Sequence, residues 1–471
     1  MTSDKEALLR RIPAVERILQ DPSLAELGGE GTPRTVLTDC VRQAVGEMRD
    51  LLSGEESISE ACEDSIQEAI LIRTRELVRE SAGPFYRKAI NATGIILHTG
   101  LGRAVLAPKA LAQVQSELSG YSLLQVDVET GKRSRRDARI EWLLSRLTGA
   151  ESATVVNNNA AATLLVLNTV GKDREVIVSR GQLVEIGGSF RLPEVMAAGG
   201  ARMVEVGTTN KTHPRDYENA VTERTAAILR VHPSNYKIVG FTEEVSAAEL
   251  AKIAHAHGLV FIDDVGAGAL IDFSRFGFAK EPTLPESIAD GADLVTSSAD
   301  KLIGAGQGGL ILGKRQLVEA VRKNPLTRAL RVGKITLAVL EATLSCFLDE
   351  AAALADIPTL RMLRRDLADL AAQADRIAAA LARYEGLQVA VIDGFSQLGS
   401  GSLPEQNLPT RLVALTSEAI GTDDLARRLR RAAPPVFARI QDDRLLIDPR
   451  TLLAGDEQIL LDALAAAVVP R

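Results

Sequence analysis

The stretch Leu294-Val-Thr-Ser-Ser-Ala-Asp-Lys-Leu-Ile-Gly-Ala-Gly-Gln-Gly-Gly309 is the most informative segment of the chain. Its apolar start, residues 294–298, is typical of a buried strand, and a second apolar run follows at 309–312. Lys301 lies between them, at the start of a glycine-rich turn. A lysine placed there can project its amine into the crevice at the carboxyl ends of a sheet. Because a desolvated amine has a lowered pKa and can attack an aldehyde, Lys301 is a Schiff-base candidate.

The residues before and after Lys301 also bear on its role. Ser298 lies three residues before Lys301, so its hydroxyl could bind an anion beside the amine. The spacing is a weak signal by itself, since a surface lysine after a strand is common. Residues 304–309 also fit the letters G-x-G-x-x-G, but they lead into a strand and not into a helix, which excludes a dinucleotide fingerprint.

Outward from this segment, short β-rich runs alternate with helical stretches between about residues 89 and 313. Near-continuous apolar strands separated by helices predict an α/β core with a mostly parallel sheet and helices on both faces. The predicted strands are 153–156, 175–179, 203–206, 226–232, 259–263, 294–298 and 309–312, with helices at 160–170 and 247–257.

The two flanks differ from this core. Residues 1–82 predict a small helical module, with helices at 36–52 and 57–78, and residues 83–330 form the large domain. Residues 331–471 predict one long Ala- and Leu-rich helix, 334–384, and a small α+β domain. The α+β domain has predicted strands at 387–392, 411–416, 436–442 and 444–447 and helices at 422–431 and 457–468.

Polar residues mark the ends of three further strands. In Val155-Val-Asn-Asn-Asn-Ala-Ala-Ala-Thr163 a strand passes into a helix that begins near Asn158, Asn159 and Ala160. Free N–H groups and the helix dipole make such a start an anion site, and small residues let a ligand approach. Plain helix capping is the alternative interpretation.

Two carboxylates end the apolar strand in Leu259-Val-Phe-Ile-Asp-Asp-Val-Gly266. A buried acid is costly unless a cation pairs with it, and a protonated pyridine nitrogen would serve. We choose Asp264 for this role and expect Asp263 to point to the other face.

In Val231-His-Pro-Ser-Asn-Tyr236, Asn235 could hydrogen-bond a phenolic oxygen, with His232 nearby; a turn built from Pro and Asn is the alternative.

An amine, an anion cradle, an acid and an amide thus fall at the ends of four strands. Together they describe a pocket for pyridoxal 5'-phosphate, although each alone is a weak signal. Their composition and order resemble the fold-type I, or aspartate-aminotransferase-like, enzymes.

Longer strings narrow the resemblance. The chain is similar to the bacterial L-seryl-tRNA(Sec) selenium transferases, or selenocysteine synthases, through the Asn157 triplet and through the strings Ile90–Ala104, Ser179–Arg191, Val206–Thr212, His232–Tyr236 and Asn324–Lys334. The N-terminal helical module and the C-terminal domain are present in the order that this family has.

The resemblance implies a fold-type I core, a homodecamer built from dimers and an N-terminal module that binds tRNA. It implies that Lys301 carries the Schiff base with the cofactor and that Asp300 assists proton transfer. It also assigns Arg103, Arg328 and Arg331 to selenophosphate, which fits the need of a phosphorylated nucleophile for fork-shaped cationic donors. Arg328 and Arg331 are three residues apart and would share a helical face; a solvated basic face is the alternative.

The implied reaction converts L-seryl-tRNA(Sec) to L-selenocysteinyl-tRNA(Sec). β-Elimination would give aminoacrylyl-tRNA, to which selenium from selenophosphate adds. One rival is a related pyridoxal phosphate-dependent lyase or aldolase that acts on a free small amino acid. Another is a catalytically silent RNA-binding protein, which the presence of Lys301 and Asp264 disfavours.

Composition limits the partners of the chain. A net charge of -7 argues against nucleic-acid binding through bulk electrostatics, so any RNA contact must be local. Candidates are Arg10, Arg11 and Arg17, or the basic run 132–139, which could equally make salt bridges between subunits.

Three scattered cysteines and the lack of an export signal or a membrane span predict a cytoplasmic enzyme without a metal site. We interpret His255 and His257 as surface residues.

Overall fold

The structure, a computed structural model, describes residues 9–24, 32–53, 63–82, 84–188, 190–401 and 406–468. The chain divides into two compact units, Met1–Lys88 and Ala89–Arg471. In the described part of the first unit, helices α2 (Val15–Leu19), α4 (Arg34–Ser53) and α5 (Glu63–Ala82) enclose their own apolar core. The helices expected at 36–52 and 57–78 are therefore present, although residues 57–62 of the second lie outside the described residues.

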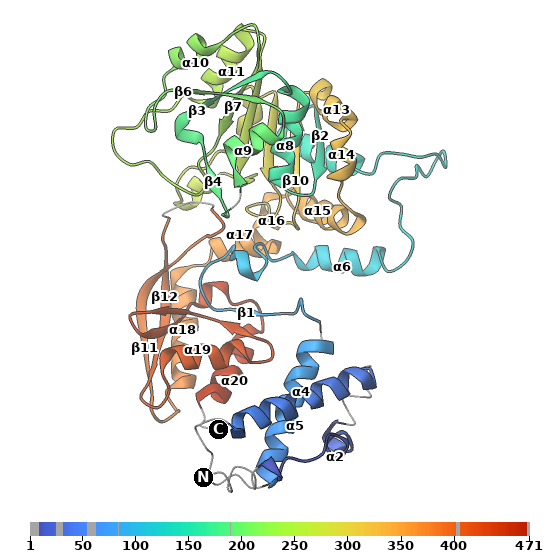
Figure 1. The fold of residues 1–471 in the computed structure, drawn as a ribbon. Helices are drawn as coiled ribbons and strands as arrows, with labels where there is room; N and C mark the ends of the chain where they lie inside the picture. The colour runs from blue at the N-terminus through green and yellow to red at the C-terminus, as the bar shows by residue number, and fades with distance from the viewer. Residues whose placement is uncertain are drawn as a thin grey trace. The chain divides into compact units, whose positions relative to one another are not determined.

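The second unit contains a seven-stranded sheet in the order β2-β10-β9-β8-β7-β3-β6 (Figure 1). In this sheet β10 alone runs opposite to the other six strands, so the prediction of a mostly parallel sheet is confirmed. The strands are β2 (Ser152–Val156), β3 (Glu175–Ser179), β6 (Arg202–Val206), β7 (Thr225–Val231), β8 (Val260–Gly266), β9 (Leu294–Ser298) and β10 (Gly309–Gly313).

Helices cover both faces of this sheet (Figure 1). One core contains buried side chains of α7 (Ala138–Thr148), α11 (Ala247–Ala256) and α15 (Lys334–Cys346). The other contains those of α8 (Asn159–Val170), α9 (Leu192–Ala198) and α13 (Arg315–Lys323). Burial on both faces explains why the strands read as continuous apolar runs in the sequence.

The parallel strands place their carboxyl ends at one edge of the sheet. The residues that follow β7, β8 and β9 therefore converge there, together with the start of α8. This is the position at which open α/β sheets bind ligands.

The prediction of one long helix at 334–384 is wrong. The segment forms four helices, α15, α16 (Glu350–Asp356), α17 (Pro358–Leu363) and α18 (Leu367–Leu381). Pro358 has no N–H to continue a helix and opens α17, and the side chain of Asp349 caps the start of α16. The abundance of Ala and Leu in the segment concealed these breaks.

The C-terminal part carries a four-stranded antiparallel sheet in the order β11-β12-β15-β14, with α18, α19 (Thr422–Arg430) and α20 (Asp456–Val468) contributing to its core. Its strands are β11 (Leu387–Ser396), β12 (Leu408–Ser417), β14 (Arg439–Gln441) and β15 (Arg444–Ile447). The strand expected at 436–442 is divided: β13 (Val436–Phe437) leaves the sheet and pairs with β1 (Ile90–Asn91). Among the described residues, no helix is both long and apolar enough to span a membrane.

Candidate active site

A cavity of about 610 Å³ opens at the carboxyl edge of the large sheet. It brings together nine of the residues expected at the site: Arg103, Asn158, Asn159, Ala160, Asn235, Asp264, Ser298, Asp300 and Lys301. These residues come from five separate segments, so the fold and not local sequence assembles the site. Thr99, Gln307 and Ser400 also line it and were not expected. Gln307 lies within the glycine-rich turn, whereas nothing in the sequence singles out Ser400.

Lys301 lies just after β9 and is only 6% exposed. Burial lowers the pKa of its amine below the ordinary value, while the carboxylates of Asp300 and Asp264 act in the opposite direction. The turn that holds the lysine is closed by a hydrogen bond from the Gly304 N–H to the Lys301 carbonyl. The amine is therefore poised toward its neutral, nucleophilic form.

Asp264 is 3% exposed at the end of β8. Its carboxylate accepts hydrogen bonds of 2.9 Å from Asn159 Nδ2 and from the Thr163 hydroxyl, both on α8. Burial nevertheless raises the pKa of Asp264, because these neutral donors do not replace water or a cation. Asp263 points away and pairs with Arg230 at 3.1 Å, as expected from the alternation of a strand.

The start of α8 has a capping side chain and also lines the cavity. Asn158 caps the helix, because its Oδ1 accepts from the Ala161 N–H at 2.9 Å. Gly309 on β10 lets the strand lie against this point: a Cβ there would be 2.0 Å from the Asn158 carbonyl oxygen. Two buried amide oxygens of the cavity, those of Asn159 and Asn235, have no partner among the described residues. The Asn235 Nδ2 donates to the Glu185 carbonyl at 2.9 Å.

Arg103 brings a cation to the cavity. Its Nη1 is 2.7 Å from Asp300 Oδ2, next to the lysine. The backbone of Arg103 has a φ of 62°, in the left-handed region that residues with a Cβ seldom adopt. Such a conformation costs on the order of 1 kcal/mol and persists only where the surroundings hold it.

These groups fit pyridoxal phosphate. Lys301 offers an amine to the aldehyde, Asp264 an acid to the ring nitrogen, and the α8 start with Ser298 an anion cradle. The two partnerless amide oxygens and the raised pKa of Asp264 show that these groups lack partners which a polar, cationic ring would supply.

Two expected residues are not in this cavity. Arg328 and Arg331 are exposed and are not among the described residues that line it. The helical face that they were expected to share does not form, because α14 (Leu326–Ala329) ends before Arg331. Arg331 instead forms an isolated β-bridge with Val156.

Comparison with known proteins agrees with this geometry. The sequence model described as L-seryl-tRNA selenium transferase matches residues 89–453, and that described as selenocysteine synthase N terminal matches residues 9–49. The chain belongs to the L-seryl-tRNA selenium transferase family.

Curated relatives extend over nearly the full chain. The L-seryl-tRNA(Sec) selenium transferase of Solidesulfovibrio magneticus is 47% identical and that of Alkaliphilus oremlandii 43%, each over 98% of this chain and over 99% and 98% of the relative. A solved D-glucosaminate-6-phosphate ammonia-lyase is 22% identical with a TM-score of 0.56, covering 83% of this chain and 98% of that one. The predicted fold-type I class is confirmed.

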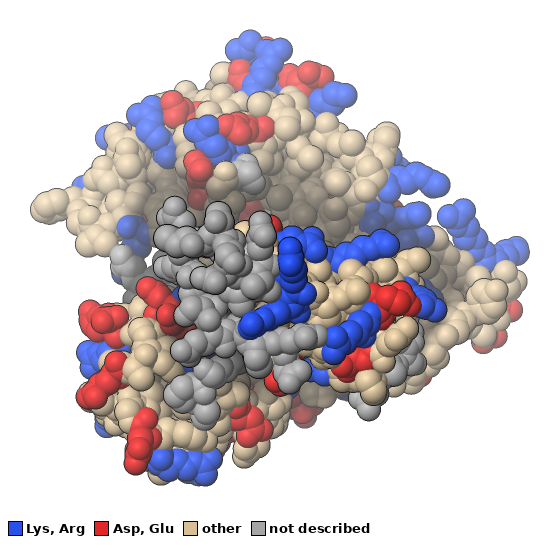
Figure 2. Space-filling view, turned by 60° about the horizontal axis from the view of Figure 1, so that its bottom comes forward, with Lys and Arg blue, Asp and Glu red and all other residues tan. Residues whose placement is uncertain are grey.

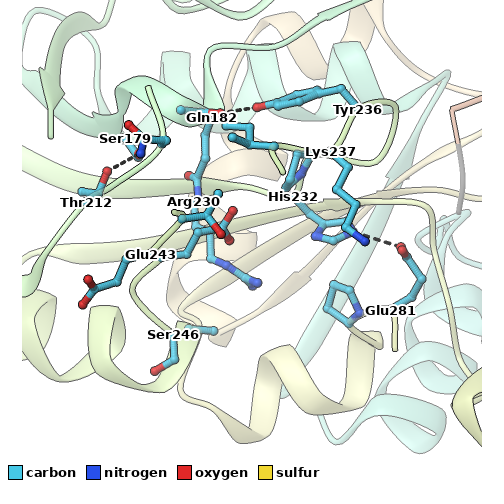
Figure 3. Close-up of a pocket in the computed structure, with 18 of the residues that line it drawn as sticks. Ser179, Gln182, Thr212, Arg230, His232, Tyr236, Lys237, Glu243, Ser246 and Glu281 are labelled. Atoms are coloured by element: carbon cyan, nitrogen blue, oxygen red, sulfur yellow. Dashed lines mark hydrogen bonds and ion pairs between the residues drawn. The ribbon is translucent and has the colours of Figure 1, made fainter. Parts of the chain in front are cut away.

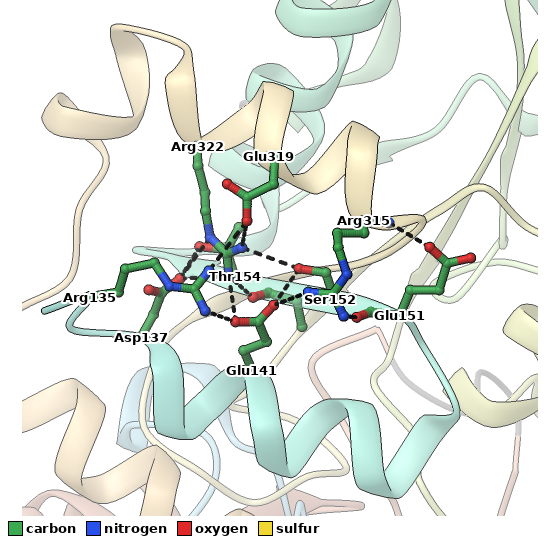
Figure 4. Close-up of polar contacts among 10 residues, drawn as sticks. Arg135, Asp137, Glu141, Glu151, Ser152, Thr154, Arg315, Glu319 and Arg322 are labelled. Carbon is green, nitrogen blue, oxygen red and sulfur yellow. Dashed lines mark hydrogen bonds and ion pairs between the residues drawn. The ribbon is translucent and has the colours of Figure 1, made fainter.

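Most of the cations in the basic run 132–139 form ion pairs or hydrogen bonds with other residues of the same chain. Arg135 pairs with Glu141 and Glu319, and Arg139 pairs with Glu341 and lies over Trp142. Figure 4 shows how Glu141 and Glu319 also meet Arg322, which reaches Asp137 at 3.1 Å. With the hydrogen bond of 3.2 Å from Arg322 to the Ser152 hydroxyl, these contacts join α7, β2 and α13 within the chain.

Burial, together with repulsion from Arg331, Arg133 and Arg328, lowers the pKa of Arg136. Its guanidinium donates to the Val332 carbonyl at 3.2 Å, beside Arg331. Four arginines therefore lie near one another outside the cavity lining, as an anion-binding cluster would require.

A second cavity, of about 860 Å³, lies next to the first and was not expected from the sequence (Figure 3). Arg230, His232, Lys237, Glu243 and Glu281 are among its charged or titratable lining residues. The His232 side chain belongs to the lining of both cavities.

No group of described residues has the three or more His, Cys, Asp or Glu side chains that a metal site needs. His255 is half-exposed and pairs with Asp293 at 3.1 Å, in keeping with the interpretation of His255 and His257 as surface residues.

Proposed function

We propose that this chain converts L-seryl-tRNA(Sec) to L-selenocysteinyl-tRNA(Sec) with pyridoxal phosphate held in the first cavity. The observation that carries the proposal is the buried amine of Lys301 in one cavity with Asp264 and the α8 start, in a chain related over 98% of its length to curated transferases. Their printed name supplies the seryl-tRNA(Sec) substrate.

Each residue has a defined task in this reaction. When bound, pyridoxal phosphate supplies an electron sink for the bond that breaks at the serine Cα. Lys301 would take the Cα proton, and its lowered pKa favours the neutral base that this step needs. Asp264 would hold the ring nitrogen, and the negative charge of its carboxylate would favour the protonated ring. Asp300, held by Arg103, keeps negative charge beside the amine.

Selenophosphate is the proposed selenium donor. Arg103 lines the cavity and can meet a phosphate, and the resemblance adds Arg328 and Arg331. Because the last two lie outside the lining of this chain's own cavity, they can serve a site only after their segment moves or in a second copy of the chain. The second possibility agrees with the homo-oligomer, dimers assembled into a decamer, that the resemblance implies.

The N-terminal unit is the proposed site of tRNA contact. Acidic and basic side chains both occur on the face of the chain drawn in Figure 2. Because the whole chain has a net charge of -7, binding would depend on local cations and on RNA shape. A cytoplasmic location is also proposed, and the free, buried thiols of Cys40 and Cys346 favour a reducing compartment.

The purified holoenzyme should be incubated with seryl-tRNA(Sec) and selenophosphate, and the aminoacyl group identified by mass after hydrolysis. We expect selenocysteine on the tRNA and no turnover of free serine. Turnover of free serine, with none of the charged tRNA, would instead establish a lyase or aldolase acting on a free amino acid.

A further inference from the structure

The pair formed by His232 and Glu281 lies between the two cavities. His232 follows β7, and its Nε2 is 3.0 Å from Glu281 Oε2. Glu281 is only 6% exposed, and both side chains line the second cavity (Figure 3). A carboxylate buried in this way needs a cationic or donating partner, and the imidazole is placed to be that partner.

The backbone fixes this imidazole relative to the cofactor site. The His232 N–H donates to the Asp264 carbonyl at 2.9 Å, so the histidine is tied to the residue that would hold the ring nitrogen. The preceding N–H, of Val231, donates to Gln182 Oε1 at 3.0 Å. Glu281 reaches the histidine from the segment that precedes α12 (Leu284–Ala289).

The proposed reaction needs an acid at this place. Hydroxide is a poor leaving group, so the serine oxygen must gain a proton as its bond to Cβ breaks. Lys301 is occupied in taking the Cα proton, and Asp300 is in an ion pair with Arg103. His232 is the one imidazole among the described residues that line the first cavity.

We propose that His232, oriented by Glu281, protonates the departing hydroxyl of the seryl substrate. The inference rests on the proposed function. The Cβ–O bond breaks with its electron pair on oxygen, the imidazolium proton moves to that oxygen, and water leaves. The Cα proton goes to Lys301, and its bonding electrons form the Cα–Cβ double bond.

The second cavity gives the pair a route to solvent. A proton from water in this cavity restores the imidazolium, and Glu281 stabilises the charge as the acid of a catalytic triad does for its histidine. The pair is thus placed beside a cavity of about 860 Å³ whose lining includes further charged side chains.

The test compares leaving groups in the holoenzyme. Single-turnover elimination is measured with seryl-tRNA(Sec) and with β-chloroalanyl-tRNA(Sec), whose chloride leaves without a proton. We expect His232→Gln to slow the seryl reaction by about 100-fold and the chloroalanyl reaction by less than about threefold. Glu281→Gln, which keeps the size of the side chain, should give a smaller loss of the same pattern, about 10-fold. His255→Gln, which removes a half-exposed imidazole paired with the buried carboxylate of Asp293, is the matched control and should change neither rate.

Cofactor content by absorbance and the urea midpoint of unfolding should be unchanged in all three variants. Equal losses on both substrates would overturn the inference, since they indicate a binding or structural role, and so would a normal seryl rate in His232→Gln. If the wild-type enzyme acts on neither charged tRNA, the proposed function fails, and the inference fails with it. The solvent isotope effect of the wild-type seryl reaction should exceed that of the chloroalanyl reaction; equal effects would contradict proton transfer to the leaving group.

Discussion

At the scale of single residues, Lys301 combines reactivity with a cost in stability. An amine that is 6% exposed loses its hydration, and this loss lowers its pKa in the folded chain. Because the folded pKa lies below the unfolded one, the penalty is fully present at low pH. It disappears as the pH rises to the unfolded value of about 10.5.

We therefore expect the apo form of Lys301→Met to be more stable than the apo wild type at pH 7, and this advantage to shrink as the pH rises toward 10. Urea unfolding at several pH values measures it. Lys252→Met, at an exposed position of α11, is the control and should show no such trend. An apo variant less stable than the wild type at pH 7 would show that the amine is not under a desolvation penalty.

Arg103 combines a strained backbone with a functional side chain. Both Arg103→Gly and Arg103→Ala remove the ion pair with Asp300, but only glycine adopts a φ of 62° without a Cβ clash. We expect the glycine variant to be more stable than the alanine variant by about 1 kcal/mol in urea unfolding. Equal stabilities would mean that the surroundings, and not the residue type, set this conformation.

Single residues also show how far the sequence could predict the site. Lys301, Asp264 and the α8 start were predictable because polar groups end apolar strands, and parallel strands end at one edge. Glu281 was not predictable: it lies 49 residues from His232 and follows no pattern of its own. The roles of Arg328 and Arg331 came from resemblance alone, and the structure leaves them outside this chain's cavity lining.

At the scale of elements, the start of α8 depends on the strand beside it. A Cβ on Gly309 would lie 2.0 Å from the Asn158 carbonyl oxygen, so Gly309→Ala must displace the helix start. We expect this variant to bind pyridoxal phosphate at least about 10-fold more weakly, a change equivalent to 1.4 kcal/mol.

The measurement is a titration of the apo protein followed by visible absorbance. Gly421→Ala is the control, because a Cβ there meets no atom within 4 Å, and its affinity should be normal. A normal affinity in Gly309→Ala would contradict the role given to the α8 start.

Elements also differed in how well their patterns predicted them. Buried strands of the large domain were found within a few residues because short apolar runs that are rich in β-branched residues and bounded by turns favour strands over helices. The segment 334–384 was misread because helix-forming residues continue through the breaks at Asp349 and Pro358. Helix propensity indicates where a helix can form and says less about where it stops.

At the scale of the whole molecule, the chain has two units with separate cores. The buried apolar cluster of the first unit is drawn only from residues before 79, and none of the other clusters uses them. Deleting residues 1–88 should therefore leave cofactor loading and the unfolding of 89–471 largely unchanged. It should abolish binding of seryl-tRNA(Sec), measured by filter binding at a fixed salt concentration. Undiminished tRNA affinity would remove the role proposed for this unit.

The central claim is that one buried amine holds the cofactor. It is tested by reducing the holoenzyme with borohydride, digesting it and locating the added pyridoxyl-phosphate mass by tandem mass spectrometry. We predict the mass on the peptide that contains Lys301 and on no other lysine. The mass on a different lysine, or its absence from a protein loaded with pyridoxal phosphate, would contradict the account.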